Sequence, residues 1–262
     1  RDRHILFRRS FALEKAPEQA LLFITADDYY KVYVNGVFAG QGPAPAYCHR
    51  YNYNTLDITA LLRPGRNVLA VHTLYQGLIN RVWVSGDNQH GLLCDLVADG
   101  AAVVCSDESF HTHPHTGYTE LGTTGYDTQF LEQYDSAAPE TDFAAPDFDD
   151  SGWEHARLRQ HADYTLVPQP SGMLEFESIP PTHTELRGRT LFVDFGSSYV
   201  GYLQAAAQGA AGSCITVRCG HELNEDGTVR WQLRANCNYS EPWLLSGRRD
   251  VLDFFDYKSF RY

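Results

Sequence analysis

Short strand-like segments, separated by turn signals about every ten residues, make up the sequence from Phe7 to Cys105, as expected of a β-sandwich or barrel. The run LLFIT (21–25) predicts one strand, and GLLCDLVADGAAVVC (91–105) predicts a hairpin around Asp99-Gly100. Aromatic residues, which are enriched in strands, make up 13% of the chain. These features together predict an all-β protein.

The clearest local element is the hairpin YYKVYVNGVFAG (29–40), whose Asn35-Gly36 dipeptide suits a type I′ turn. Pairing across this turn places Tyr33 opposite Phe38, so apolar and polar positions alternate coherently on the two faces of the hairpin. The residues just before the hairpin, Asp27 and Asp28, are acidic and stand at the entry of the strand. We favour a bend at these two residues, with an ion site as the alternative.

Residues 106–190 interrupt this regular pattern, because Pro, Asp, Thr and Gly replace the periodic apolar positions. We predict an irregular connection with one short helix around Gln129 to Tyr134, followed by an extended linker at IPP (179–181). Strands resume in segments 190–196, 200–208 and 213–220 and continue to the last residue. Because the chain also starts without an initiator Met, we interpret it as a segment of a longer protein.

The overall charge and the apolar runs exclude two classes of partner. The sequence carries 21 Lys and Arg against 33 Asp and Glu, a formal net charge of -12, which would repel a nucleic-acid backbone. No apolar run approaches the roughly 20 residues that span a bilayer. We therefore expect neither a nucleic-acid nor a membrane partner.

The cysteines do not form a metal-binding motif, because none of the six falls in a Cys-x-x-Cys arrangement. One pair can be positioned from the sequence. A two-residue turn at Asp99-Gly100 would place Cys94 opposite Cys105, within disulfide range. We favour two buried reduced thiols, and a Cys94–Cys105 disulfide stays open.

Three polar clusters are candidates for catalytic or metal chemistry, and each has a simpler structural interpretation. HTHPH aligns His111, His113 and His115 at a period of two, which on a strand would place three imidazoles on one side as metal ligands. Pro114 lowers the strand prediction, so we favour a solvated loop.

The other two clusters are acidic. DFDDSGW (147–153) offers the carboxylates that a glycosidase needs, but Asp149-Asp150 before Ser-Gly is more typical of a turn and helix cap. GHELNEDGTVRW (220–231) contains His221 and Glu222, yet the segment from Asn224 to Gly227 is written as a hairpin loop. No nucleophile elbow, phosphate loop or dinucleotide fingerprint occurs, so the residues alone assemble no active site.

Several segments, taken in order along the chain, resemble the front half of bacterial α-L-rhamnosidases of glycoside hydrolase family 78. The likeness to the N-terminal β-sandwich domain lies in FRRSFAL (7–13), ITADDYYKVYVNGVFAGQGPA (24–44), YNTLDITALLRPGRNVLAV (53–71) and DFDDSGWEHA (147–156). The likeness to the concanavalin-like domain lies in PPTHTE (180–185), LFVDFGSSYVGYLQ (191–204), GAAGSCITVRCGHELNEDGTV (209–229) and FFDYKSFRY (254–262).

This resemblance implies two jelly-roll β-sandwich domains joined by an irregular linker. We expect a galactose-binding-like domain at residues 1–168 and a concanavalin-like domain, truncated at its C-terminal end, at residues 169–262. In the family an (α/α)6 barrel follows and carries the general acid and base of an inverting hydrolysis that releases terminal α-L-rhamnose. Nothing in this sequence matches that barrel, so we assign no catalytic residue and expect the segment alone to be inactive.

The resemblance also implies a role for the acidic bend, because some related sandwiches bind rhamnose with calcium. Sugar diols chelate calcium when acidic side chains supply further oxygen ligands. We therefore name Asp27, Asp28 and Tyr30 as candidate carbohydrate-binding residues, with Asp27 and Asp28 as candidate calcium ligands. The expected partners are the catalytic barrel and rhamnose-containing glycans. The alternative is a stand-alone, lectin-like carbohydrate-binding module.

Overall fold

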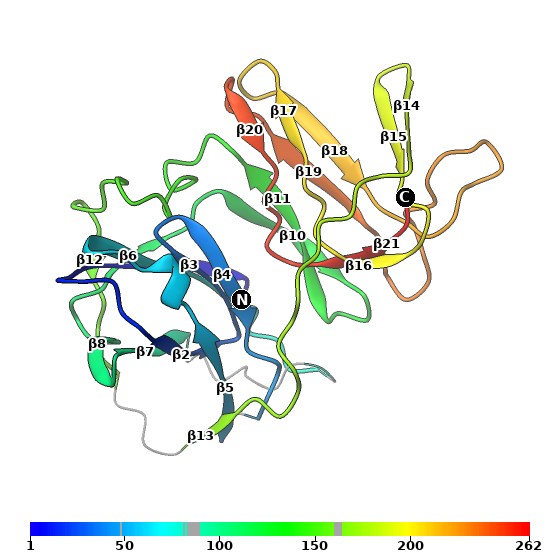
Figure 1. Ribbon diagram of the computed structural model, residues 1–262. Coiled ribbons are helices and arrows are strands. Elements are labelled where there is room, and N and C mark those ends of the chain that lie inside the picture. The colour runs from blue at the N-terminus through cyan, green and yellow to red at the C-terminus, as the bar shows by residue number, and fades with distance from the viewer. Residues whose placement is uncertain (48, 81, 83–89, 160–163) are drawn as a thin grey trace. The chain divides into compact units, whose positions relative to one another are not determined.

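The computed structural model describes residues 1–47, 49–80, 82, 90–159 and 164–262 (Figure 1). Strands dominate these residues, and the helical structure among them is one 3-10 turn, η1 (Thr59–Leu61). Asp57 opens this turn, because its carboxylate accepts hydrogen bonds from the Thr59 backbone N–H and hydroxyl. The all-β prediction is confirmed. Among the described residues, no helix has the length and apolar character needed to cross a membrane.

The chain divides into two compact units that each combine two segments. The first unit contains Arg1–His115 and Asp142–Leu174, and the second contains Thr116–Thr141 and Glu175–Tyr262. The segment Thr116–Thr141 thus packs with the second half of the chain, although it precedes the linker. The boundary between residues 168 and 169 stays a prediction, because compact packing of a segment and membership of a domain are different properties.

The first unit contains two sheets. The six-stranded sheet has the order β12 (Glu154–His155), β9 (His111–Pro114), β1 (Arg3–Leu13), β6 (Gly65–Tyr75), β3 (Tyr29–Val34) and β4 (Val37–Gly42). The five-stranded sheet has the order β13 (Thr165–Pro168), β5 (Arg50–Asp57), β2 (Ala20–Asp27), β7 (Gly91–Ala98) and β8 (Ala101–Cys105). Neighbouring strands are antiparallel except for the parallel pair of β13 with β5.

A shared apolar core makes these two sheets a sandwich. On β2 the even-numbered residues, including Leu22 and Ile24, are buried in one cluster with Val32 of β3 and Val71 of β6. This alternation follows from the period of two along a strand, which sends every second side chain to the same face. The predicted sandwich is therefore held together by the alternate, apolar side chains on the inner face of each sheet.

The predicted hairpin over residues 29–40 is confirmed. Asn35 and Gly36 have φ angles of 52° and 82°, the positive values that a type I′ turn requires. Tyr33 lies opposite Phe38, with their ring centroids 5.7 Å apart in an edge-to-face arrangement. The register of β3 and β4 is therefore set by its turn and held by aromatic packing.

The predicted alignment of Cys94 with Cys105 is wrong. A bulge between Leu96 and Val97 shifts the register of β7 and β8, so Asp95 lies opposite Cys105. Cys94 is buried and Cys105 is exposed, and both are free thiols. A one-residue shift moves a side chain to the other face, and this explains the difference.

The second unit contains a four-stranded sheet and three two-stranded pairs. The four-stranded sheet has the order β10 (Tyr118–Thr124), β11 (Gln129–Asp135), β19 (Ser240–Leu244) and β18 (Cys214–Arg218). The pairs are β14 (His183–Arg187) with β15 (Thr190–Asp194), β16 (Tyr199–Gly201) with β21 (Lys258–Phe260), and β17 (Ala206–Gln208) with β20 (Arg249–Val251). The expected continuous strand over 200–208 is thus interrupted.

The short helix predicted around Gln129 to Tyr134 is wrong, because these residues form β11. This strand pairs antiparallel with β10 and parallel with β19, about a hundred residues further along the chain. Its alternate residues Phe130, Glu132 and Tyr134 are buried. Tertiary pairing therefore decides the structure of a segment whose local sequence is ambiguous.

Candidate functional site

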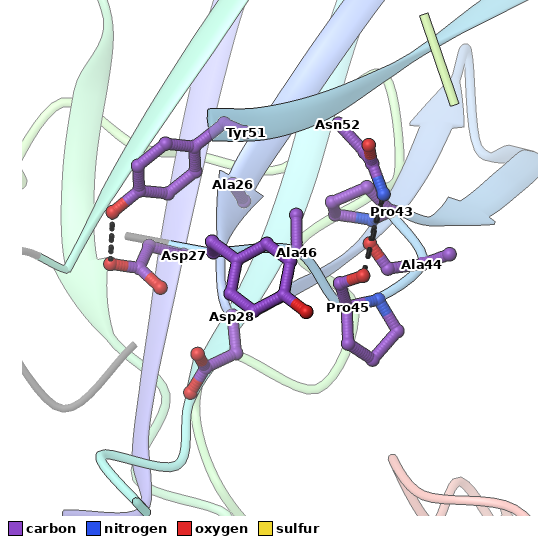
Figure 2. A pocket seen from close by; sticks show the side chains of 10 residues that line it. Ala26, Asp27, Asp28, Pro43, Ala44, Pro45, Ala46, Tyr51 and Asn52 are labelled. Carbon is purple, nitrogen blue, oxygen red and sulfur yellow. Dashed lines mark hydrogen bonds between the residues drawn. The ribbon is translucent and has the colours of Figure 1, made fainter. Parts of the chain in front are cut away.

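A small pocket lies at the bend between β2 and β3 of the first unit, where the acidic pair is found (Figure 2). Its volume is about 20 Å³, enough for a single water or ion but not for a sugar ring. The lining residues are Ala26, Asp27, Asp28, Pro43, Ala44, Pro45, Ala46, Tyr47, Tyr51 and Asn52. Any larger ligand would therefore contact the mouth of this pocket.

The bend itself is confirmed. β2 ends at Asp27, Asp28 forms the bend, and β3 begins at Tyr29. The Asp27-Asp28 peptide bond is cis. Both aspartates are buried, so each carboxylate needs partners that replace water.

The two carboxylates of the bend have different partners. Asp27 accepts a hydrogen bond from the Tyr51 hydroxyl on β5, with 3.2 Å between the oxygens. Asp28 accepts from the backbone N–H groups of Gln76 and Gly77, at 2.8 and 3.3 Å. In Figure 2 the Asp27 carboxylate faces the Tyr51 hydroxyl, whereas the Asp28 carboxylate points away from it. Asp28 therefore fastens the end of β6, and Asp27 remains at the pocket wall.

The opposite wall of the pocket is held by Asn52 of β5. Its side-chain amide donates to the carbonyl oxygens of Ala44 and Pro45, at 3.1 and 3.4 Å. These bonds fix the segment that follows β4 against β5. The pocket is thus lined by carboxylate, carbonyl and amide oxygens on rigid backbone.

An aromatic side chain is exposed at the mouth. Tyr47 lines the pocket, has 63% of its surface exposed and stacks on His49 with a ring separation of 5.6 Å. An exposed aromatic face is apolar on its surface and polar at its edge, which suits contact with a sugar ring. Sequence reasoning missed Tyr47, because a tyrosine in a loop carries no periodic signal.

Tyr30, the third predicted site residue, lies in the core and not at the pocket. Its side chain is completely buried in the apolar cluster between the sheets, and its hydroxyl donates to the Asn54 side-chain oxygen at 2.6 Å. Burial raises the pKa of this phenol far above its ordinary value. The structure therefore brings Asp27 and Asp28 to the pocket but places Tyr30 behind it.

Gln76 is a buried polar residue that the sequence did not indicate. It is completely buried beside Asp28, and among the described residues neither its side-chain oxygen nor its nitrogen has a hydrogen-bond partner. Burying an amide without partners costs roughly 1–3 kcal/mol. Gln76 is tied to the bend by its backbone N–H, which Asp28 accepts, but its side chain does not line the pocket.

The described residues fit a calcium ion only with mixed oxygen donors. Within the described ranges, no group of three or more His, Cys, Asp or Glu side chains is placed to hold a metal ion. Calcium takes six to eight oxygen ligands, including carbonyls, amides and water. The Asp27 and Asp28 carboxylates, which line the pocket, offer part of such a set, and sugar hydroxyls and water would complete it.

His111 and His113 lie on a strand, β9, and His115 directly follows it, so the predicted solvated loop is wrong. The imidazoles have separate partners: His111 approaches Asp150 at 3.4 Å, and His113 stacks on Trp153 with 5.3 Å between centroids. His115 packs against His72. The strand exists despite Pro114 because this proline is its last residue.

The two acidic clusters are structural. Asp149 accepts the Ser151 backbone N–H in a turn, which confirms that part of the prediction, and Asp150 pairs with the buried Arg8 guanidinium at 3.1 Å. In segment 220–231, the Leu223–Val229 bridge closes the expected hairpin loop. Asp226 accepts hydrogen bonds from the backbone N–H and the hydroxyl of Thr228, within this loop.

Comparison with known proteins assigns both halves of the chain. Residues 15–176 match the family model of the alpha-L-rhamnosidase N-terminal domain, and residues 184–262 match that of the bacterial alpha-L-rhamnosidase concanavalin-like domain. The two matches follow one another along the chain, and the segment Thr116–Thr141, which packs in the second unit, lies within the first match. The chain belongs to the bacterial α-L-rhamnosidase family.

Two curated α-L-rhamnosidases match this chain over nearly its whole length. An α-L-rhamnosidase of Streptomyces avermitilis is 27% identical over 97% of this chain and 26% of its own length. One from Alteromonas sp. (strain LOR) is 23% identical over 97% of this chain and 29% of its own. The chain therefore spans little more than a quarter of the curated relatives that it matches.

Solved structures show the same fold. The crystal structure of the Streptomyces avermitilis α-L-rhamnosidase complexed with L-rhamnose matches with a TM-score of 0.78 at 24% identity, covering 99% of this chain and 26% of that chain. The α-L-rhamnosidase of Dictyoglumus thermophilum matches with a TM-score of 0.77 at 24% identity, covering 99% and 30%. At this level of identity the likeness concerns the fold.

Proposed function

We propose that the chain is the N-terminal, non-catalytic part of a glycoside hydrolase that removes terminal α-L-rhamnose from glycans. Its family membership and the share of the relatives that it spans support this proposal. In the complete protein a C-terminal (α/α)6 domain performs the inverting hydrolysis, and the two domains described here support it. The expected boundary between them is at residues 168 and 169.

A scaffolding role is supported by exposed apolar side chains in the second unit. Leu186 and Leu191 lie opposite one another on β14 and β15 and are 72% and 64% exposed. Val200 and Val251 are 68% and 61% exposed. An exposed cross-strand apolar pair such as Leu186 and Leu191 is suited to contact with another domain.

We further propose that the first unit binds rhamnose-containing carbohydrate at the pocket of Figure 2. The observation that carries this is the combination of two buried carboxylates and an exposed aromatic ring that line one pocket. A calcium ion held by Asp27 and Asp28 would supply a positive charge that binds a vicinal diol. Tyr47 would contact the apolar face of the sugar ring.

The absence of catalysis is tested directly with the purified chain and an aryl α-L-rhamnoside. We expect no release of the aryl alcohol, since glycosidase chemistry requires two carboxylates about 5–9.5 Å apart and the acidic clusters are engaged in turns. Measurable turnover by the chain alone would contradict the proposal. The length of the native reading frame distinguishes a glycoside hydrolase from a stand-alone module. Several hundred helix-rich residues beyond Tyr262 would indicate the enzyme, and their absence would indicate a lectin-like module.

The binding site is tested by calorimetry with L-rhamnose. Asp27→Asn removes the carboxylate charge at the pocket and should weaken binding at least tenfold. Asp226→Asn is the matched control, because this carboxylate accepts hydrogen bonds within an exposed loop of the second unit. Equal weakening by both substitutions, or by neither, would show that the pocket is not the binding site.

A further inference from the structure

A second cavity lies in the first unit beside the pocket of Figure 2 and is ten times larger. Its volume is about 200 Å³, and it shares Ala26, Asp27 and Tyr51 with the small pocket. We call it the apolar cavity. The Asp27–Tyr51 hydrogen bond thus lies in a wall common to both.

The floor of the apolar cavity is made by side chains of the sandwich interior. Phe7 of β1 and Leu92 of β7 are partly buried and pack against the core, and Phe110 is only 1% exposed. Ala156 is held in place by its backbone N–H, which donates to the Phe110 carbonyl at 2.8 Å. A floor of this kind offers no hydrogen bond to a ligand but a large apolar contact.

The sides of the cavity are aromatic and cationic. Tyr51 and Tyr164 line it with their rings edge-to-face, 5.2 Å between centroids. Arg157 and Arg159, both exposed, stand at its rim. Aromatic edges and guanidinium groups both interact favourably with the face of another aromatic ring.

We propose that the apolar cavity binds the aromatic ring of an aryl glycoside whose sugar contacts the mouth of the small pocket. The volume agrees with this occupant, because an apolar cavity of about 150 Å³ accommodates benzene. Asp27 faces both spaces, and a carboxylate accepts up to about four hydrogen bonds, so it can accept a ligand hydroxyl beside that of Tyr51.

The position of the sugar rests on the proposed function, but the preference of the cavity for an aryl ring does not. The test is calorimetry with three probes: methyl α-L-rhamnoside, 4-nitrophenyl α-L-rhamnoside and 4-nitrophenol. We expect the aryl rhamnoside to bind about tenfold more tightly than the methyl rhamnoside, since the ring leaves water for an apolar site. We expect 4-nitrophenol to bind measurably alone.

Two variants fill the cavity from different walls. Ala156→Phe and Leu93→Phe each place an aromatic side chain in it, so either one should abolish the tenfold advantage and leave methyl rhamnoside binding unchanged. Ala101→Phe adds the same side chain at an exposed position away from the cavity and should keep the advantage. Thermal melting of each variant verifies that it is folded. If one of the two cavity-filling variants does not fold, the other still tests the proposal.

The outcomes separate the two proposals. Binding of 4-nitrophenol without binding of methyl rhamnoside, lost in the fillers, would contradict the sugar site and support the aryl site. Equal affinities for methyl and aryl rhamnosides would overturn the aryl proposal and leave the sugar site standing. An aryl advantage that survives both fillers would overturn it as well, because the ring would then bind elsewhere.

Discussion

A fall in pH should destabilise the first unit through a pair of buried histidines. His4 of β1 and His72 of β6 are 6% and 0% exposed, and their ring nitrogens Nδ1 and Nε2 lie 2.9 Å apart. Burial lowers the pKa of both imidazoles well below the ordinary value of 6.5, and the neighbouring His115 lowers it further. Both side chains are therefore neutral in the folded protein at neutral pH.

The sign and the magnitude follow from proton linkage. Because the folded pKa lies below the unfolded one, the unfolded chain binds the extra protons. The stability from neutral burial is then complete above the unfolded pKa and is lost as the pH falls below it. Between about pH 7.5 and about pH 5.5, protonation of each histidine in the unfolded chain lowers the free energy of unfolding by about 1.4 kcal/mol. The two histidines together lower it by about 2.7 kcal/mol. The hydrogen bond from Arg261 lowers the pKa of Asp194 to about 2, so this carboxylate titrates below the pH range of the histidines.

The assay is urea unfolding at several pH values, with hydrogen exchange of the β1 and β6 amides as the local readout. Burial also lowers the pKa of His90, to about 3, so three histidines contribute to the slope of stability against pH. His72→Gln keeps a polar side chain but removes one of these titrating groups, so the slope should fall by about a third. An unchanged slope in His72→Gln would refute the reasoning. A free energy of unfolding that stays constant between about pH 7.5 and about pH 5.5 would refute it too.

Two further substitutions test what holds the first unit together. Arg8→Met should lower the free energy of unfolding in urea by about 3 kcal/mol, because the buried guanidinium donates to Asp150 and to three backbone carbonyls of the segment 143–148. Arg9→Met removes one hydrogen bond, to the Ser109 carbonyl, and should lower it by about 1 kcal/mol. Gly42→Ala should lower the melting temperature, since its Cβ would meet the Asn54 side-chain oxygen, whereas Gly152→Ala meets nothing within 4 Å and should leave it unchanged.

Local chemistry explains the parts of the fold that the sequence predicted. The turn at Asn35-Gly36 needs two positive φ angles, and these residue types adopt them most readily, so the hairpin and its Tyr33–Phe38 pair could be predicted. The bend at Asp27-Asp28 could be predicted because two adjacent aspartates separate two strand-like segments. Each of these features depends on residues close together in the chain.

Features that depend on distant residues could not be predicted in the same way. Residues 129–135 become a strand because β19, more than a hundred residues later, pairs with them. The bulge at Leu96 and Val97 changes the partner of Cys105, and nothing in the hairpin sequence indicates an extra residue there.

The candidate site was predicted in part for the same reason. Asp27 and Asp28 are adjacent in sequence and were identified, but their partners are distant in sequence: Tyr51 lies on β5 and Gln76 directly follows β6. Tyr30 was misplaced because alternation along β3 turns it toward the core, next to Asn54. A buried amide such as Gln76 has no signal in the sequence until the fold encloses it.

The most direct test of the proposed carbohydrate site is calorimetry of the chain with L-rhamnose, before and after removal of calcium by a chelator. The proposal predicts saturable binding in calcium, its loss on chelation and its return when calcium is added back. Titrations that stay flat with and without calcium would contradict it. Binding that is indifferent to the chelator would contradict the role of Asp27 and Asp28 as calcium ligands.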